Sequence, residues 1–174
     1  MDTWQPERFE ELYERFFTPV FRYVLLRVKN RAEAEDLAQT VFMKAYQANP
    51  PGKAGKTGPE LSLNYFFTVA RNTVIDHWRK KKEVVVDDPD EVFENIPDTE
   101  DPEDDAMRGE SRTAVREALE HVSASEQEVL ILKFMNELST KEIAQLLGKT
   151  EVAVRQSQSR GLKALREHLQ EKDI

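Results

Sequence analysis

The stretch RKKKEVVVDDPDEVFENIPDTEDPEDD, residues 79–105, decides how the chain is organised. Its first four residues are all cationic, and the next 23, residues 83–105, include twelve acidic side chains and no basic one. A segment of this composition repels itself and offers little apolar surface to bury. We therefore predict an all-α chain with two small helical bundles, residues 1–82 and 111–174, joined by an acidic, flexible linker over residues 83–110.

The charge of the chain is unevenly distributed. All 174 residues together carry a formal net charge of −8, which by itself argues against a nucleic-acid partner. Residues 83–105 contribute −12 to this total, so the other 151 residues carry a net charge of +4. Because the local distribution of charge decides what a surface attracts, both bundles are candidates for binding nucleic acid.

The composition argues against several classes of protein. The chain has no cysteine, which excludes disulfides and thiolate metal sites, and its three histidines show no metal-ligand spacing. We expect no metal and no cofactor, and the lack of paired carboxylates or a nucleophile–base arrangement argues against an enzyme. The polar N-terminus does not resemble a signal peptide, and the apolar runs are too short to span a bilayer. The expected location is the cytoplasm, with no membrane insertion.

Apolar residues recur at three- and four-residue steps in the first bundle. This period predicts three packed helices, the third over residues 63–82. Pro19 lies within the first apolar stripe, so we expect a kink or a restart near residues 17–18. The residues expected to point inward are Phe9, Leu12, Tyr13, Phe16, Val20, Val24 and Val28, then Ala34, Leu37, Ala38, Val41, Phe42, Ala45 and Tyr46, and finally Phe67, Ala70, Val74 and Trp78.

The predicted third helix carries polar, cationic and aromatic side chains outside its apolar stripe. Guanidinium and amide groups contact phosphates and base edges, and aromatic rings hold bases that have left the stack. This combination suits unpaired DNA better than closed duplex. Phe67 and Trp78 are better explained as core residues, whereas Tyr65 and Phe66 fit either role. The polar and cationic residues are Arg71, Asn72, Asp76, Arg79, Lys80, Lys81 and Lys82.

Residues 49–61 are rich in glycine and proline and contain GKAGKTG, residues 52–58. A phosphate-binding loop would need a glycine five positions before Gly55, where Pro50 stands, and a buried strand before it. Nucleotide hydrolysis is therefore disfavoured. A cationic loop next to the aromatic start of a helix is better suited to hold a displaced DNA strand.

The second bundle has the spacing of a helix-turn-helix. Ala144 supplies a small residue where two helices cross, Gly148 can adopt the positive φ of the turn, and Val154 locks the second helix. Thr150 is the expected N-cap of that second helix, over residues 151–169. The side chains expected on its exposed face are Arg155, Gln156, Ser157, Ser159, Arg160, Lys163 and Arg166, which suit base edges near the start and phosphates further along.

Two pairs spaced three residues apart, Ser123 with Glu126 and Ser139 with Glu142, have the form of capping boxes. Each pair predicts that a helix begins just after the serine. The residues expected to be buried by the first of these helices are Val129, Leu130, Leu132 and Phe134, and a short helix before it is expected to bury Ala114, Val115, Ala118, Leu119 and Val122.

Three further motifs, taken in order, resemble signatures of the extracytoplasmic-function sigma factors, which are compact bacterial initiation subunits of RNA polymerase. They are EDLAQTVFMKA (residues 35–45), FTVARNTVIDH (residues 67–77) and LSTKEIAQLLG (residues 138–148). Their order, their spacing and the length of the chain all match, so the resemblance covers nearly the whole sequence.

The resemblance implies a role for each bundle. The first would bind core RNA polymerase and, with the loop of residues 49–61, melt and read the −10 element of promoter DNA, and the second would read the −35 element. An anti-sigma factor is implied as a further partner. The implied contact residues are Asp36, Leu37 and Gln39 for the polymerase, Arg71, Asn72, Asp76, Arg79 and Lys80 for the −10 element, and Arg155, Gln156, Ser157, Ser159, Arg160 and Lys163 for the −35 element.

Four positions depart from the pattern of that family. Thr40 stands where glutamate is usual, and Ser123 replaces a common proline, which its capping box can explain. Ser157 and Gln158 stand where a basic residue and leucine are common, so the −35 preference of relatives is not carried over. The alternative function is an operator-binding helix-turn-helix regulator with a helical sensing or dimerisation domain. A sensor would need a concave apolar pocket in the first bundle and would have no use for the cationic run 79–82 beside an aromatic helix start.

Overall fold

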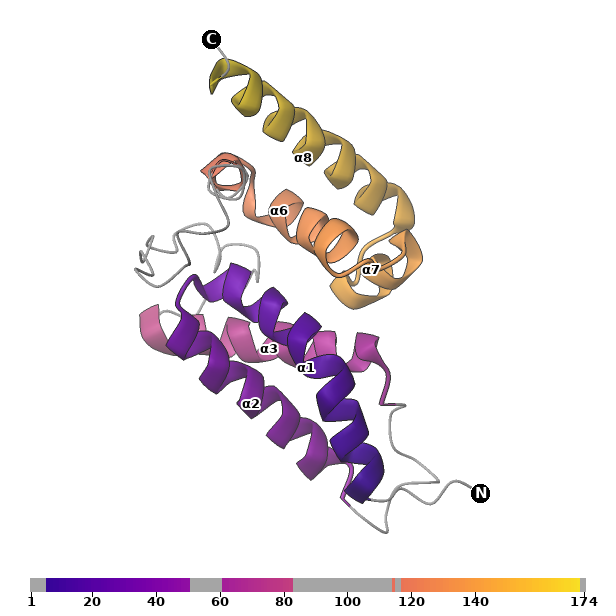
Figure 1. Ribbon diagram of the computed structural model, residues 1–174. Coiled ribbons are helices and arrows are strands. Elements are labelled where there is room, and N and C mark those ends of the chain that lie inside the picture. The colour runs from indigo at the N-terminus through magenta and orange to yellow at the C-terminus, as the bar shows by residue number, and fades with distance from the viewer. Residues whose placement is uncertain (1–5, 51–60, 83–113, 115–116, 173–174) are drawn as a thin grey trace. The chain divides into compact units, whose positions relative to one another are not determined.

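The structure, a computed structural model, describes residues 6–50, 61–82, 114 and 117–172 (Figure 1). The chain divides into two compact units, Met1–Asp87 and Asp88–Ile174. Within the described ranges every regular element is helical and no strand occurs, which confirms the predicted all-α fold. The predictions for the acidic linker and for most of the glycine-rich loop lie outside these ranges.

The first unit contains α1 (Pro6–Val28), α2 (Arg31–Ala48) and α3 (Leu63–Lys82) (Figure 1). Each of the three helices contacts the other two, so the predicted three-helix bundle is confirmed. The third helix has the predicted bounds. Its amphipathic period continues over the whole predicted range, and this period is the signal from which the prediction was made.

Side-chain caps fix where α2 and α3 begin. Asn30 Oδ1 accepts a hydrogen bond from the Glu33 N–H at 3.0 Å, and Ser62 Oγ accepts one from the Tyr65 N–H at 3.2 Å. Each bond satisfies a backbone donor that has no partner within the helix. At the other end of α2, the Asn49 side-chain amide donates to the Ala45 carbonyl oxygen at 2.9 Å.

Aromatic rings fill the middle of the first unit. The Phe42 and Phe66 rings stack with their centroids 4.7 Å apart, and Phe16 lies 5.5 Å from Phe66. Tyr13 and Tyr46, which were predicted to point inward, are 37% and 41% exposed. The predicted inward residues that are buried are Phe16, Val20, Val24, Val28, Ala34, Ala38, Val41, Phe42, Ala45, Phe67, Ala70, Val74 and Trp78.

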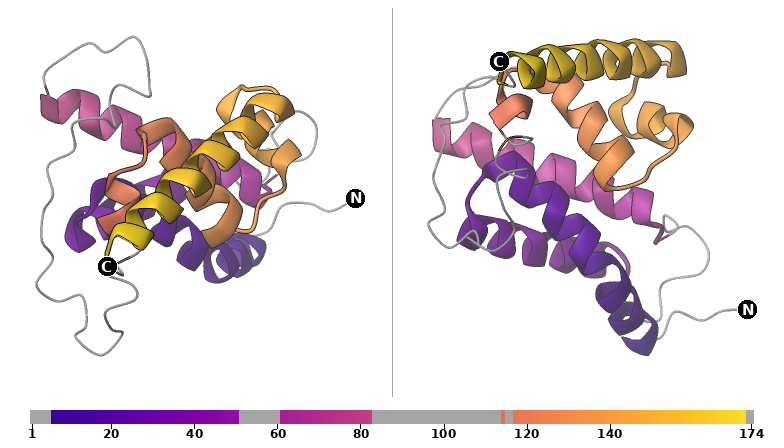
Figure 2. Two further views of the ribbon diagram at one scale, coloured as in Figure 1. Left: turned by 90° about the horizontal axis from the view of Figure 1, so that it is seen from above. Right: turned by 45° about the horizontal axis from the view of Figure 1, so that its top comes forward.

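α1 differs from its prediction in two respects. It runs unbroken through Pro19, so the helix does not restart, and its ribbon bends along its length instead (Figure 2). Phe16 and Val20, on either side of the proline, are both in the core and hold the helix in place where one backbone hydrogen bond is missing. Tyr23 and Arg27 are also fully buried, at 0% and 1% exposure, although neither was among the residues expected inside.

The second unit contains α6 (Ala124–Leu130), the π-helix η1 (Ile131–Met135), α7 (Thr140–Leu147) and α8 (Glu151–Lys172). α8 contacts both α6 and α7 (Figure 2). Its inner side packs against a small cluster of Leu119, Val122 and Leu130. Gly161 lies at this crossing, where an added Cβ would come within 2.8 Å of the Leu130 Cδ1 atom. A larger residue at this position would force the Leu130 side chain to move.

The prediction that Phe134 is buried is wrong, because it is 55% exposed. The prediction assumed an α-helical period, but the chain changes to π-helical geometry at Ile131. The Asn136 N–H donates to the Ile131 carbonyl oxygen, five residues earlier, at 3.2 Å. A π turn therefore holds one residue more than an α turn, and the side chains of Phe134 and Met135 lie outside the core. Val129, Leu130 and Leu132 are buried as predicted.

Candidate nucleic-acid interface

One flank of α3 combines an amide, a carboxylate, a guanidinium and an aromatic ring. Tyr65, Asn72, Asp76 and Arg79 are spaced by seven, four and three residues, which places them on one face of the helix. We call these four residues the α3 flank. Asn72 and Asp76 are exposed, whereas Tyr65 and Arg79 are half-buried. Half-buried Arg71 and exposed Lys80 lie at its two edges.

The other aromatic residues of α3 belong to the core. Phe66 is fully buried and stacks on Phe42 of α2. Phe67 and Trp78 are also buried, which confirms their interpretation as core residues. The suggestion that Phe66 could hold an unstacked base is therefore wrong. Tyr65 is the remaining aromatic side chain with its ring partly open to solvent on this flank.

Lys81, which the sequence analysis places among the cations outside the apolar stripe of α3, forms an ion pair with α2. Its Nζ atom lies 2.8 Å from Glu33 Oε1 on α2 and 5.2 Å from the centre of the Trp78 ring. His77 approaches the same carboxylate, with its Nε2 atom 3.6 Å from Glu33 Oε2. The Lys81 ion pair therefore joins the C-terminal part of α3 to the start of α2.

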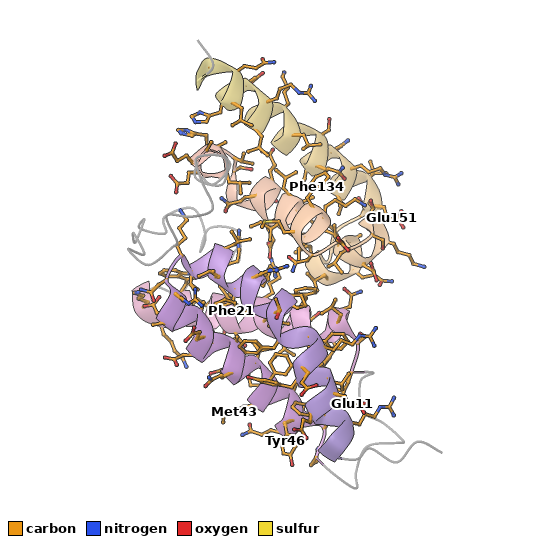
Figure 3. All side chains as sticks on the ribbon, in the orientation of Figure 1. Glu11, Phe21, Met43, Tyr46, Phe134 and Glu151 are labelled. Carbon is orange, nitrogen blue, oxygen red and sulfur yellow. The ribbon has the colours of Figure 1, made fainter. Side chains whose placement is uncertain are left out.

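α2 presents a mixed polar and apolar surface. Asp36 and Gln39 are exposed, Leu37 is half-buried, and Met43 is 60% exposed one turn beyond Gln39 (Figure 3). The Thr40 hydroxyl donates to the Asp36 carbonyl oxygen at 2.8 Å, so this hydroxyl is satisfied within the helix. Met43 was not predicted as part of this surface, although its position outside the apolar stripe of α2 already indicated an exposed apolar side chain.

The helix-turn-helix prediction is confirmed. Gly148 ends α7 with φ +63°, in the left-handed region, and the Lys149 N–H donates to the Ala144 carbonyl oxygen at 2.9 Å. Thr150 Oγ1 caps α8 by accepting from the Ala153 N–H at 3.1 Å. Ala144 is 6% exposed and Val154 is fully buried, as their predicted roles require.

The helix starts in the second unit follow from serine caps. At α7 both bonds of the Ser139 box are present: the Glu142 N–H donates to Ser139 Oγ at 3.2 Å, and the Ser139 N–H donates to Glu142 Oε2 at 2.7 Å. At α6 the Glu126 N–H donates to Ser123 Oγ at 3.4 Å. Lys149 Nζ donates to Ser125 Oγ at 2.7 Å, which joins the turn of the helix-turn-helix to α6.

The outer side of α8 carries most of the predicted readers. Arg155, Gln156, Ser159, Arg160, Lys163 and Arg166 are exposed. Ser157 is half-buried, because it lies three residues after buried Val154 and four before buried Gly161 and so shares their side of the helix. Its predicted exposure is wrong.

The first turn of α8 adds two residues that sequence reasoning overlooked. Exposed Glu151 has its Oε2 atom 3.5 Å from Arg155 Nη2, and Arg155 Nε donates to the Glu151 carbonyl oxygen at 3.4 Å. Val152, three residues before Arg155, lies on the same side of the helix as Arg155 and is 60% exposed. We call Val152, Arg155, Gln156, Ser159 and Lys163 the α8 face, because their spacing of three or four residues aligns them.

The described residues show no arrangement typical of a metal site or of a membrane span. Nowhere in these ranges do three histidine or acidic side chains gather in a way that could hold a metal ion. None of the helices in the described ranges is both long and apolar enough to cross a membrane.

Two family models match the chain: Sigma-70 region 2 over residues 12–84, and Sigma-70, region 4 over residues 112–165. The ECF RNA polymerase sigma factor SigL of Mycobacterium tuberculosis is 31% identical over 161 residues, which cover 92% of this chain and 88% of SigL. The ECF RNA polymerase sigma factor BldN of Streptomyces coelicolor is 29% identical over 161 residues, and the match spans 60% of the length of BldN.

A solved structure has the same fold. It is the sigma factor RpoE in complex with the anti-sigma factor NepR from Bartonella quintana, with a TM-score of 0.71, 21% sequence identity, and coverage of 94% of this chain and 98% of that one. At this level of identity the likeness concerns the fold alone.

Proposed function

The chain belongs to the extracytoplasmic-function sigma factors, which direct RNA polymerase to promoters, and we propose that it binds the core enzyme and reads both promoter elements. The observation that carries this proposal is the presence, in one chain, of the α3 flank and the helix-turn-helix of α7 and α8. The first suits unpaired bases and the second suits the major groove of duplex DNA. An operator-binding regulator would need only the second.

The α3 flank is assigned to the −10 element. The Asn72 amide can donate to and accept from a base edge, and the Asp76 carboxylate can accept from an exocyclic amino group. Arg79 and Lys80 supply positive charge for the phosphates of the opened strand, with Arg71 at the other edge. Tyr65 adds a partly exposed ring on which an unstacked base can lie.

The α8 face is assigned to the −35 element. Arg155 and Gln156 lie within the first two turns, where the side chains of a recognition helix reach base edges. Ser159, Arg160 and Lys163 follow along the exposed side and suit the phosphate backbone. Ser157 is assigned a packing role, because its half-buried position turns it away from this face.

The exposed side of α2 is assigned to the polymerase. Asp36 and Gln39 offer a charge and an amide, and Met43 adds an adaptable apolar contact beside them. Leu37 supports this surface from a half-buried position. The protein acts by binding and not by catalysis, in the cytoplasm where polymerase and chromosome meet. Because RpoE was solved with an anti-sigma factor, a partner of that type is assigned to this chain as well.

Reconstitution with core RNA polymerase tests the proposal. The full chain should co-purify with the core enzyme and support run-off transcription from promoters selected by the reconstituted enzyme. Asp36→Arg should reduce binding to the core enzyme by at least tenfold. The substitution replaces an exposed carboxylate by a cation, which would face a partner surface that pairs with a negative charge. Gln47→Arg, at an exposed position near the end of α2, is the control and should bind normally. High affinity for a duplex operator without any polymerase binding would favour the regulator instead.

A further inference from the structure

Val152 is an apolar side chain at a position where stability alone gives no reason for one. It is 60% exposed in the first turn of α8, directly after Glu151, which marks the start of this helix in Figure 3. A β-branched side chain on an open helix face loses rotamer freedom and gains nothing from burial. A partner that covers Val152 would supply the missing gain.

The surroundings of Val152 are polar. Arg155 and Gln156 follow it by three and four residues, and Ser159 by seven, so all four side chains point to the same side of α8. The other apolar residues with large exposed side chains in the described part of this unit, Phe134 and Met135, belong to η1. Val152 is therefore an isolated apolar contact among groups that suit base edges.

The first turn of α8 is held firmly in place. Thr150 caps it through the Ala153 N–H at 3.1 Å, and Gly148 fixes the preceding turn with its left-handed backbone. Val154, two residues further on, is fully buried. The position of Val152 is therefore set by the helix-turn-helix itself, and its two methyl groups are presented in a fixed direction.

The major groove contains one apolar group at the base edges, the C5-methyl of thymine. We propose that Val152 contacts this methyl group at one position of the −35 element and so makes the α8 face selective for thymine there. The proposal rests on the function proposed above, since it needs α8 to lie in the groove. It differs from a hydrogen-bonded readout, because it depends on the methyl group and not on the O4 acceptor of the same base.

The test uses the full chain assembled with core RNA polymerase. Selection from promoters with a randomised −35 element gives the preferred sequence, and each of its thymines is then replaced by deoxyuridine, which lacks only the C5-methyl. For the wild-type chain, one replacement should weaken promoter binding about fourfold, as expected for one lost methyl contact. Val152→Ser should bind the two versions equally, whereas Val152→Ile should still discriminate. Each ratio is measured within one variant, so a general loss of affinity does not affect it.

Two results would overturn the inference: thymine and deoxyuridine bound equally at every position by the wild-type chain, or undiminished discrimination by Val152→Ser. Arg155→Ala separates this from a failure of the proposed function. If that variant binds more weakly yet still discriminates at the same thymine, α8 reads the element and Val152 supplies the methyl contact. If no −35 element is selected, or if Arg155→Ala binds as well as wild type, the proposed function fails together with the inference.

Discussion

α3 and α8 carry the two candidate DNA-contacting surfaces, and they differ in how much of each helix is left for a partner. α3 contacts both α1 and α2, and its buried residues include Phe66, Phe67 and Trp78. Only a narrow strip around Asn72 and Asp76 is exposed. α8 packs on α6 and α7 through one side, and its other side is open along the helix.

The difference shows how a core limits a binding surface. A helix packed between two neighbours can offer only a strip, and the direction of that strip depends on the whole bundle. Glu33 adds to this dependence, because it ties the basic end of α3 to α2. The α8 face, by contrast, can change its residues with little effect on folding, since exposed side chains contribute little to stability.

The largest expected effect concerns the aromatic start of α3. Phe66→Ala should lower the free energy of unfolding of the first unit by about 3–5 kcal/mol, because it leaves a cavity beside Phe42. Tyr65→Ala, the neighbouring half-buried position, should cost about 1 kcal/mol or less in stability. Chemical denaturation followed by circular dichroism measures both. A larger cost for Tyr65 than for Phe66 would mean that the division of α3 into core and flank is wrong.

Arg155→Ala should act on duplex DNA and leave folding unchanged. The loss of a bidentate base contact should cost about 1–3 kcal/mol in affinity for the −35 element and relax the preference at one base pair. Competition binding with single-base variants of the element reports both effects. Arg166→Ala, further along the exposed side, is the matched control and should weaken binding equally for all sequences. Equal relaxation by both variants would contradict a base contact by Arg155.

Asn72→Ala should act on strand opening and spare duplex binding. Its loss should slow promoter opening about tenfold, in the range of one base contact, while the affinity for closed duplex stays near the wild-type value. Permanganate footprinting of thymines around the −10 element follows opening directly. If the Asn72→Ala variant opens promoters at the wild-type rate, the α3 flank does not melt DNA and can serve only to bind a partner.

The smallest effect separates two adjacent lysines. Lys81→Met should lower stability by about 0.2–1 kcal/mol, because the ion pair with Glu33 is partly exposed and screened. Lys80→Met should leave stability unchanged but weaken the hold on opened DNA. Thermal unfolding and a salt titration of promoter binding distinguish the two. If both variants weaken DNA binding alike, Lys81 contacts the nucleic acid in addition to pairing with Glu33.

Much of the fold could be predicted because its signals are local. The bounds of α3 followed from the period of its apolar residues, and Ser139 and Gly148 marked the helix-turn-helix through a cap and a left-handed turn. Most of the core of the first unit was predictable for the same reason. The exceptions are Tyr13 and Tyr46, which the pattern includes but which are exposed, and Arg27, which is buried although its charge keeps it out of an apolar pattern.

The errors arose where tertiary structure decides the direction of a side chain. Lys81 belongs to a cationic run, but its partner Glu33 lies 48 residues earlier. Ser157 looked exposed by residue type, although it lies three residues after Val154, and the close crossing of α6 and α8 at Gly161 shows that this side of the helix is buried. Val152 was overlooked because an apolar residue in an amphipathic helix is expected to point inward.

The π-helix η1 has a consequence for how the chain tolerates a change of length. Since a π turn holds one residue more than an α turn, a single deletion within Ile131–Met135 could be absorbed by a return to α-helical geometry. The same deletion early in α8 would turn every later side chain by about 100° around the axis. When relatives are aligned with this sequence, a one-residue gap therefore fits η1 and does not fit α8.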